Sequence, residues 1–367
     1  MRRWVVGCAT LLAGALLVEW GLTQPVRVGY APTEANSQRK VVAAEQVLIT
    51  YTAAVSGVPA VLLDEVGPDG SRRTVLRVSE GPGPATLSTL VTGPGGGLHV
   101  AWTEFTGSLG RVHYRRRAAG AWTPPAAVSP SGAYAGYPSL DVDSTGRVHL
   151  AWYGIRQSAG GRPVAHGGIY EIFYTQLRGG AWTVPEVLSP GVPDSLNPAL
   201  AVDAAGRVHV VWFQSDGRAY QVVYRMRAQD GAWTPPGYLT DGEAPSTRPA
   251  LAVDGAGTVH VVWEHRDGIW YRSGRSGRWD RVVRIAPRGR RPAVGVVGAS
   301  VFVAWSDGQA VWLRVRSRGW RPAARLGTGD HPSVFPWRAG QASRPWAVWT
   351  VGAQVRAEDL SVLVGRR

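Results

Sequence analysis

Cysteine and lysine are almost missing from this chain of 367 residues, which has one of each, Cys8 and Lys40. Cys8 lies in the first apolar segment, so everything after it lacks a thiol. This excludes disulfides and cysteine-ligated metals from the rest of the chain, whose stability must therefore come from packing. Since lysine is so rare, the net charge of +14 is carried almost wholly by arginine.

Acidic residues are scarce in one part of the chain. Residues 268–325 contain thirteen arginines but only two acids, Asp280 and Asp307. A basic face there would favour anionic partners such as acidic glycans, wall polymers, lipid head groups or nucleic acid. A solvated surface without a partner is the alternative.

Long hydrophobic runs are absent after the N-terminal one. Arg2 and Arg3 precede an apolar run that begins at Trp4, which is the order of charge and apolar residues in an export signal. We predict that residues 1–22 are either a signal peptide or an N-terminal membrane anchor spanning 4–22. In both cases residues 23–367 form one domain outside the cytoplasm, secreted or tethered to the outer face of the cytoplasmic membrane.

Phenylalanine and methionine are also rare, at 5 and 2 residues, whereas tryptophan reaches 17 and glycine 47. Such a bias indicates a few residue types repeated at fixed structural positions. An aromatic residue recurs at intervals of 51, 50, 60, 51, 42 and 44 residues, which is the size of a four-stranded propeller blade. These marker aromatics are Tyr51, Trp102, Trp152, Trp212, Trp263, Trp305 and Trp349.

Each repeat predicts four strands. In the fourth unit they are "PALAV", "RVHVVWF", "YQVVYRMR" and "WTPPGYL", joined by turns such as "DAAG". A second tryptophan opens the fourth strand of five units, and we expect both tryptophan sets to pack between blades. This second set is Trp122, Trp182, Trp233, Trp279 and Trp320.

The repeat count predicts an all-β, seven-bladed β-propeller, with six blades and a decorated rim as the alternative. The last unit offers only three strands before the chain stops, and Val26–Ala31 is a spare strand near the start. We predict that this spare strand completes the last blade and closes the ring, so that no sheet edge is left open between the ends.

The unit "PALAVDAAGRVHVVW…YRMRAQDGAWTPP" resembles the bacterial neuraminidase repeats (BNR, or Asp-box, type) of the sialidase-like β-propeller superfamily, over roughly residues 38–364. The resemblance implies a propeller fold and structural Asp-box turns, of which "QDGAWT" keeps Asp230, Gly231 and Trp233. It also implies an active-site set of three arginines that clamp a carboxylate, an aspartate acid/base and a late tyrosine activated by a glutamate.

Two parts of that implied active site are missing from the sequence. The early Phe/Tyr-Arg-Ile/Leu-Pro motif is absent, and no tyrosine follows Tyr271. We therefore predict a propeller that binds a carbohydrate or anionic polymer at its channel mouth without turning it over. A glycoside hydrolase of sialidase (exo-alpha-sialidase) type is one alternative, and an extracytoplasmic scaffold that binds an envelope protein is another.

Two sets of residues are candidates for the ligand site. The third unit has an insertion of about ten residues whose glycines, arginines and aromatics suit an acidic or sugar ligand, although a plain insertion is the alternative. Its candidates are Tyr153, Arg156, Arg162 and His166. The second set precedes the proline of each first strand, and the proline predicts an extended conformation at the channel mouth. This set is Tyr137, Asn197, Arg248, Arg291 and His331, with Tyr134, Asp194, Asp241 and Glu243 on nearby connectors.

The ring around the channel combines aromatic, amide, guanidinium and imidazole groups, a mixture that suits a saccharide or an anion, with a solvated pore lining as the alternative. Four further histidines share one repeat position, and we interpret them as structural: His99, His149, His209 and His260. No metal or cofactor is predicted. Nucleic acid is not favoured, because the tryptophan periodicity assigns these rings to the core and not to a stacking platform.

Overall fold

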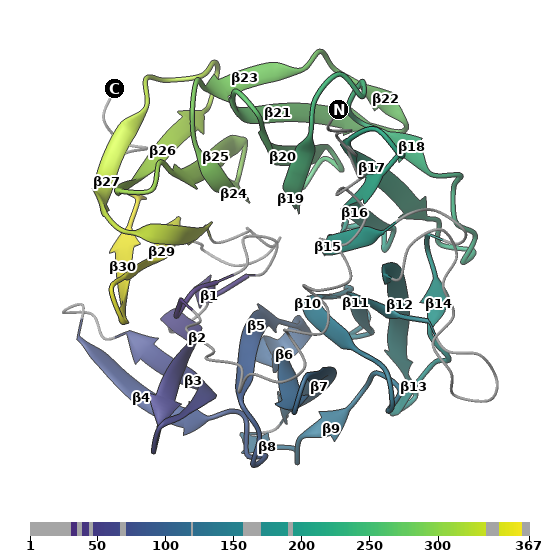
Figure 1. The fold of residues 1–367 in the computed structure, drawn as a ribbon, viewed down its shortest axis with the longest axis vertical. Coiled ribbons are helices and arrows are strands. Elements are labelled where there is room, and N and C mark those ends of the chain that lie inside the picture. Colours follow the sequence, from purple (N-terminus) through teal and green to yellow (C-terminus); the bar gives the residue numbers. More distant parts are fainter. Residues whose placement is uncertain are drawn as a thin grey trace, which may run out of the picture.

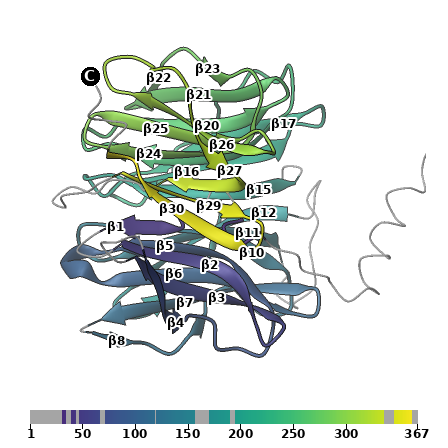
Figure 2. The same ribbon diagram turned by 90° about the vertical axis from the view of Figure 1, so that its left-hand side faces the viewer.

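The computed structural model describes residues 31–34, 39–43, 47–66, 71–118, 120–156, 170–189, 194–334 and 345–361. These residues form seven antiparallel sheets arranged as blades around a central axis (Figure 1). Turned by 90°, the same sheets are seen stacked along the ring (Figure 2). The seven-bladed prediction is confirmed, and the six-bladed alternative is wrong. The N-terminal segment 4–22 and the spare strand Val26–Ala31, except for Ala31 itself, lie outside the described residues.

The first three blades follow one another along the chain. Blade 1 contains β1 (Val41–Ala43), β2 (Val47–Val55), β3 (Val58–Val66) and β4 (Arg72–Arg77). Blade 2 contains β5 (Ala85–Thr92), β6 (Leu98–Thr106), β7 (Leu109–Ala118), β8 (Ala121–Trp122) and β9 (Ala126–Ala127), with the short 3-10 helix η1 (Pro94–Gly96) between β5 and β6. Blade 3 contains β10 (Ala135–Val142), β11 (Val148–Ile155), β12 (Tyr170–Arg178), β13 (Ala181–Trp182) and β14 (Glu186–Val187).

The remaining four blades complete the ring. Blade 4 contains β15 (Ser195–Val202), β16 (Val208–Ser215), β17 (Tyr220–Arg227) and β18 (Gly237–Tyr238). Blade 5 contains β19 (Ser246–Val253), β20 (Val259–His265), β21 (Gly268–Arg275), β22 (Arg278–Trp279) and β23 (Val283–Ala286). Blade 6 contains β24 (Arg290–Val297), β25 (Ser300–Ser306), β26 (Ala310–Arg316) and β27 (Ala324–Thr328). Blade 7 contains β28 (Asp330–Val334), β29 (Trp346–Val351) and β30 (Gln354–Asp359).

The marker aromatics occupy the second strand of every blade, as the repeat predicts. All six tryptophans of this set are buried, and the most exposed of them, Trp305, is 4% exposed. Tyr51 in blade 1 is only partly buried. Packing of these large apolar rings against residues of the neighbouring sheet removes most of their surface from water, which makes them the main source of cohesion between blades.

The fourth-strand tryptophans are half-buried and link each blade to the one before it. Four of the five stand edge-on to a third-strand tyrosine of the preceding blade, and such pairs contribute about 0.5–1.5 kcal/mol beyond the area that they bury; Trp122 instead packs on the apolar cluster shared with blade 1. The pairs are Tyr114–Trp182, Tyr174–Trp233, Tyr224–Trp279 and Tyr271–Trp320, with ring centroids 5.0–5.1 Å apart.

A third-strand arginine forms a second link between blades. In blade 4, Arg225 donates from Nε to the Thr234 carbonyl and from Nη1 to the Leu188 carbonyl of blade 3, both at 2.8 Å. The equivalent arginines bridge blade pairs in the same way: Arg115, Arg272 and Arg314. Part of the arginine excess in residues 268–325 is therefore structural, since Arg272 and Arg314 join blades.

The repeated histidines lie in separate blades, as predicted. Each one pairs through Nδ1 with a third-strand tyrosine hydroxyl at 2.6–2.8 Å. In three blades the Nε2 atom also faces a turn aspartate, as His209 faces Asp203 at 3.3 Å. Burial alone would raise the pKa of Asp203, but hydrogen bonds from His209 and Arg207 outweigh it and lower the pKa to about 2.

Among the described residues, no helix has the length and apolar character needed to cross a membrane.

Candidate functional site at the channel mouth

A β-bulge interrupts the first strand of six blades near its N-terminal end. The register with the second strand shifts there, for example between Thr247 and Ala250 in blade 5 and between Arg290 and Ala293 in blade 6. A bulge leaves one residue unpaired, so a proline, which lacks an N–H, can sit in an inner strand without losing a ladder bond.

The residue before each of these prolines has a positive φ, so the predicted extended conformation is wrong. The φ angles of this set lie between 47° and 55°, in the left-handed region, and the set is Tyr137, Asn197, Arg248, Arg291 and His331. Leu87 of blade 2 shares the conformation, although serine and not proline follows it. The bulge overrides the local preference that proline imposes, and bulges of this kind re-aim side chains next to functional sites.

Carboxylates hold the arginines of this ring in place. Arg248 Nη1 pairs with Glu264 Oε1 at 3.1 Å, and the other oxygen of Glu264 accepts from the Arg291 backbone N–H at 3.1 Å. Arg291 Nη1 and Arg290 Nη2 both reach Asp330 Oδ2, at 2.6 Å and 2.9 Å. A chain of alternating charges thus runs around the mouth from blade 5 to blade 7.

Arg39 crosses the channel below this ring. Its guanidinium donates to the carbonyls of Leu140 in blade 3 and Leu200 in blade 4, both at 3.0 Å, and pairs with Asp141 at 3.1 Å. The carbonyl of Arg39 itself accepts from Leu90 in blade 2. Arg39 therefore joins blades 2, 3 and 4 on the channel side of the ring. Burial lowers the pKa of Arg39 to about 10, so the group is still charged at neutral pH.

The single lysine, Lys40, is buried beside Arg39. Its Nζ donates to the Ser88 carbonyl, and its backbone N–H donates to Ser333 Oγ at 3.1 Å. Burial lowers the pKa of Lys40 to about 7, although the nearby Glu34 opposes the shift. Burial likewise raises the pKa of Glu34, and the cations that oppose this shift are Lys40, Arg291 and Arg248.

His331 belongs to the same ring of residues. Burial and the neighbouring Arg291 lower its pKa to about 4, so its imidazole is neutral at physiological pH. Its Nδ1 is buried and makes no hydrogen bond with any described residue.

Four tyrosines gather on the mouth side of blade 3. Tyr153 is central: its ring centroid lies 5.1 Å from that of Tyr137, 5.4 Å from Tyr170 and 5.7 Å from Tyr134. Tyr153 lies in β11 and not in the insertion. Burial, and then the neighbouring phenols, raise the pKa of Tyr153 far above its ordinary value, so its hydroxyl stays protonated.

The insertion of the third unit is described only at its edges. Arg156 follows β11, and its Nη1 lies 3.9 Å from the buried Glu171. Arg162 and His166 lie outside the described residues. Asp194, on the connector that leads into blade 4, accepts a hydrogen bond from the Tyr170 backbone N–H at 3.0 Å.

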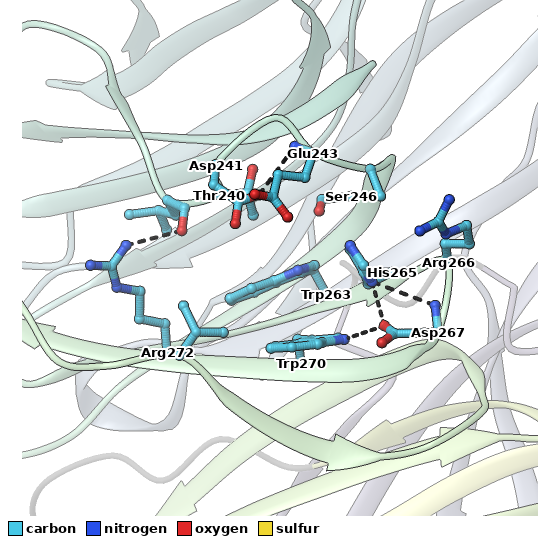
Figure 3. A pocket seen from close by; sticks show the side chains of 13 residues that line it. Thr240, Asp241, Glu243, Ser246, Trp263, His265, Arg266, Asp267, Trp270 and Arg272 are labelled. Carbon is cyan, nitrogen blue, oxygen red and sulfur yellow. Dashed lines mark hydrogen bonds and ion pairs between the residues drawn. The ribbon is translucent and has the colours of Figure 1, made fainter. Parts of the chain in front are cut away.

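Asp241 and Glu243 line a cavity of about 420 Å³ in blade 5, outside the ring itself. The cavity lies between the connector from β18 to β19 and the hairpin of β20 and β21 (Figure 3). Trp263, His265 and Trp270 also line it. The connector that carries these two acids leads to the first strand of blade 5, at the axis. The sequence therefore places the acids near the ring, whereas the structure places their side chains at the cavity.

Several site residues carry no signal in the sequence. Glu264 and Asp330 lie within β20 and β28, and Arg39 and Lys40 lie directly before β1. Only their cross-blade partners reveal their positions. Among the residues that the structure describes, no group of three or more His, Cys, Asp or Glu side chains is placed to hold a metal ion.

No protein-family model matches this chain, and no curated protein matches its sequence. Solved structures do resemble it. One is a polysaccharide lyase, an ulvan lyase bound to -[GlcA(1-4)Rha3S]-, with a TM-score of 0.59 and 10% identity over 90% of this chain and 93% of that chain.

Two glycan-related enzymes from other organisms resemble the chain as well. The leech intramolecular trans-sialidase in complex with 2,7-anhydro-Neu5Ac has a TM-score of 0.53 and 10% identity, over 76% of this chain and 68% of that chain. The alpha-L-arabinofuranosidase of Fusarium graminearum in complex with arabinobiose has a TM-score of 0.52 and 13% identity, over 76% and 94%. At these identities the likeness concerns the fold, and the chain is a β-propeller.

Proposed function

We propose that this protein is an exported propeller of the sialidase-like superfamily that binds an acidic carbohydrate or anionic polymer at its channel mouth without turning it over. The superfamily rests on the repeat, and export rests on the N-terminal residues 1–22. The observation that carries the binding function is the pair of arginines, Arg248 and Arg291, fixed at the channel mouth by Glu264 and Asp330.

The arrangement suits an anionic group for a physical reason. A guanidinium presents N–H donors in a planar fork whose geometry matches a carboxylate or a sulfate, and the ion pairs orient the forks of Arg248 and Arg291 at the mouth. Because the carboxylates fix both side chains before a ligand arrives, binding costs little side-chain entropy. The tyrosine cluster of blade 3 adds an aromatic wall on the same side of the ring.

The tyrosines support binding in preference to hydrolysis. Tyr271, the last tyrosine of the chain, is 1% exposed, and its hydroxyl is bonded to His260 at 2.7 Å. Tyr153 at the mouth has a raised pKa and faces another phenol, the Tyr134 hydroxyl at 3.4 Å. A nucleophilic tyrosine needs a base that takes its proton, and among the described residues neither hydroxyl is paired with a carboxylate.

A glycan array and a heparin column test this proposal. We expect retention of acidic glycans by the wild-type protein, and loss of that retention in the double variant Arg248→Gln and Arg291→Gln. Arg275→Gln is the control, because Arg275 is an exposed arginine at the β21–β22 turn, away from the ring. Failure of the wild type to retain any acidic glycan, or equal retention by the double variant, would count against the proposal.

A glycoside hydrolase of sialidase type is the second candidate, and one observation favours it. Glu243 lies opposite the pair formed by His265 and Asp267 across the blade 5 cavity (Figure 3). Two acidic groups on either side of a sugar are what glycoside hydrolysis requires. If the wild type releases fluorophore from aryl glycosides and Glu243→Gln does not, the protein is a glycoside hydrolase. If the wild type releases no fluorophore from a broad panel of aryl glycosides, this second candidate is wrong.

A further inference from the structure

The blade 5 cavity and the arginines of the mouth lie at the same end of β19 and β20, one strand residue apart, on opposite faces of the blade. In the register of β19 and β20, Ser246 faces His265 and Thr247 faces Glu264. Ser246 and His265 line the cavity, and Glu264 is the partner of Arg248 at the mouth. A ligand anchored at Arg248 therefore reaches the cavity by passing over the ends of β19 and β20, a distance of one strand residue.

One wall of the cavity is aromatic and held rigidly. Trp270 donates from Nε1 to Asp267 Oδ1 at 2.8 Å, and the same carboxylate oxygen is bonded to His265 Nδ1. Trp263, on the adjacent strand, lies beside Trp270 and is 2% exposed (Figure 3). Because Asp267 fixes the indole, Trp270 offers a preformed apolar surface of the kind that ligand pockets use.

The opposite wall is polar. Glu243 and Asp241 lie across from the indoles (Figure 3). The Asp241 carboxylate accepts from the Glu243 backbone N–H at 3.2 Å, whereas the Glu243 carboxylate makes no hydrogen bond or ion pair with any described residue. Glu243 is thus an acceptor for hydroxyl groups that enter the cavity, and His265 Nε2 is the remaining polar atom of its ring.

The charges divide the face into two regions. The mouth carries arginines, whereas Asp241, Glu243 and Asp267 surround the cavity. Arg272 also lines the cavity, but its guanidinium is bonded to the carbonyls of Asp280 and Leu239, and Arg266 is exposed at the rim. A second anionic group would meet these carboxylates and be repelled, while an uncharged sugar would not.

We propose that the blade 5 cavity is a subsite for a neutral sugar residue next to the acidic residue bound at the mouth. The pyranose ring packs its C–H face on Trp270 and donates hydroxyl hydrogens to Glu243. The ligand is then an oligosaccharide or polymer in which acidic and neutral sugars are adjacent, and the cavity volume suits one such residue. This inference rests on the proposed function, which it extends from a single acidic group to a chain.

Isothermal titration calorimetry with a length series tests the inference. The probes are glucuronic acid and the tetrasaccharide of hyaluronan, which alternates glucuronic acid with a neutral N-acetylhexosamine. We expect the wild type to bind the tetrasaccharide at least about tenfold more tightly than the monosaccharide. Trp270→Ala and Glu243→Gln should each remove most of this gain and leave monosaccharide affinity unchanged.

Blade 6 offers a matched control. Trp312 pairs with Trp305 across β25 and β26, just as Trp270 pairs with Trp263 across β20 and β21. Trp312 also donates from Nε1 to an aspartate, Asp307, at 2.8 Å. Unlike Trp270, it does not line the cavity. Trp312→Ala should leave both affinities unchanged. An all-acidic tetragalacturonate should gain less over its monosaccharide than the hyaluronan tetrasaccharide does.

The outcomes separate the two proposals. Equal wild-type affinity for monosaccharide and tetrasaccharide, or an equal effect of Trp270→Ala and Trp312→Ala, overturns the subsite. Tetrasaccharide binding that depends on Trp270 but survives Arg248→Gln and Arg291→Gln overturns the mouth proposal and keeps the subsite. Because Glu243 is an exposed loop residue, Glu243→Gln tests the cavity even if Trp270→Ala fails to fold.

Discussion

The residues with a left-handed backbone at the mouth carry a conformational cost that the ring imposes on them. For side chains other than glycine this conformation costs of order 1 kcal/mol or more. Six blades repeat it, so the cost recurs around the axis in the residues that face the ligand. The strained conformation is maintained because the register of the flanking strands allows no other course for the chain.

Arg248 allows strain and binding to be measured separately. Arg248→Gly and Arg248→Ala both remove the guanidinium, but only glycine relieves the positive φ of 47°. We expect the glycine variant to be more stable than the alanine variant by about 1 kcal/mol in urea unfolding, and both to lose the same share of acidic-glycan affinity. Equal stability of the two variants would show that the bulge carries no strain.

His331 predicts a specific dependence of stability on pH. Its pKa in the folded protein is about 4, below the ordinary value of 6.5, because burial and then Arg291 disfavour the charged ring. Between these two pKa values His331 is protonated in the unfolded chain but neutral in the native state. The free energy of unfolding therefore falls as pH drops from about 6.5 toward about 4. Arg290 and Lys40 act in the same direction and Asp330 opposes them.

Replacement of this histidine checks that dependence. His331→Asn keeps a residue that tolerates a positive φ but does not titrate. We expect urea unfolding at pH 7.5, 5.5 and 4.5 to show a shallower loss of stability in the variant than in the wild type. Identical slopes would mean that His331 is protonated normally in the folded protein.

At the scale of strands, the sequence predicted the second and third strands best. "RVHVVWF" and "YQVVYRMR" correspond closely to β16 and β17, because buried β-branched and aromatic residues leave little choice. The bulge of the first strand could not be predicted, because it depends on how that strand pairs with the second strand of the same blade. The fourth strand was predicted too long: in "WTPPGYL" the two prolines cannot donate, and only Gly237–Tyr238 forms β18.

The arginine links between blades predict a difference between arginine and lysine. Arg225 satisfies two carbonyls of different blades and lies over the Trp233 ring at 5.7 Å. A lysine cannot reach both carbonyls with one ammonium, so Arg225→Lys should cost roughly 1–3 kcal/mol, nearly as much as Arg225→Met. Denaturant unfolding of both variants checks this, and a lysine variant as stable as the wild type would contradict it.

At the scale of the whole molecule, residues 39 and 40 tie distant blades together. Arg39 contacts blades 3 and 4, while the Lys40 backbone N–H and carbonyl bond to Ser333 in blade 7 and Thr50 in blade 1. Arg39→Met leaves Asp141 without its buried partner and should cost about 3–5 kcal/mol in urea unfolding. Arg325→Met, at an exposed position of β27, is the control and should change stability by less than about 0.5 kcal/mol. A similarly small effect of Arg39→Met would mean that this side chain does not hold blades 3 and 4 together.

The site was harder to predict from the sequence than the fold. The ring residues could be found because a repeat marks their position, whereas Glu264, Asp330 and Arg39 act only through partners in other blades. Asp241 and Glu243 are predicted near the ring because they lie on a connector, and in the structure that connector lines the blade 5 cavity. Positions set by repetition are therefore readable in the sequence, and positions set by contacts across the ring are not.

A crystal structure of the protein with an acidic tetrasaccharide tests the central claim most directly. We predict a sugar carboxylate between Arg248 and Arg291, with the chain continuing over Trp270 in blade 5. A saccharide bound instead to the opposite face of the ring, near the β21–β22 turn, with an empty channel mouth, would contradict it.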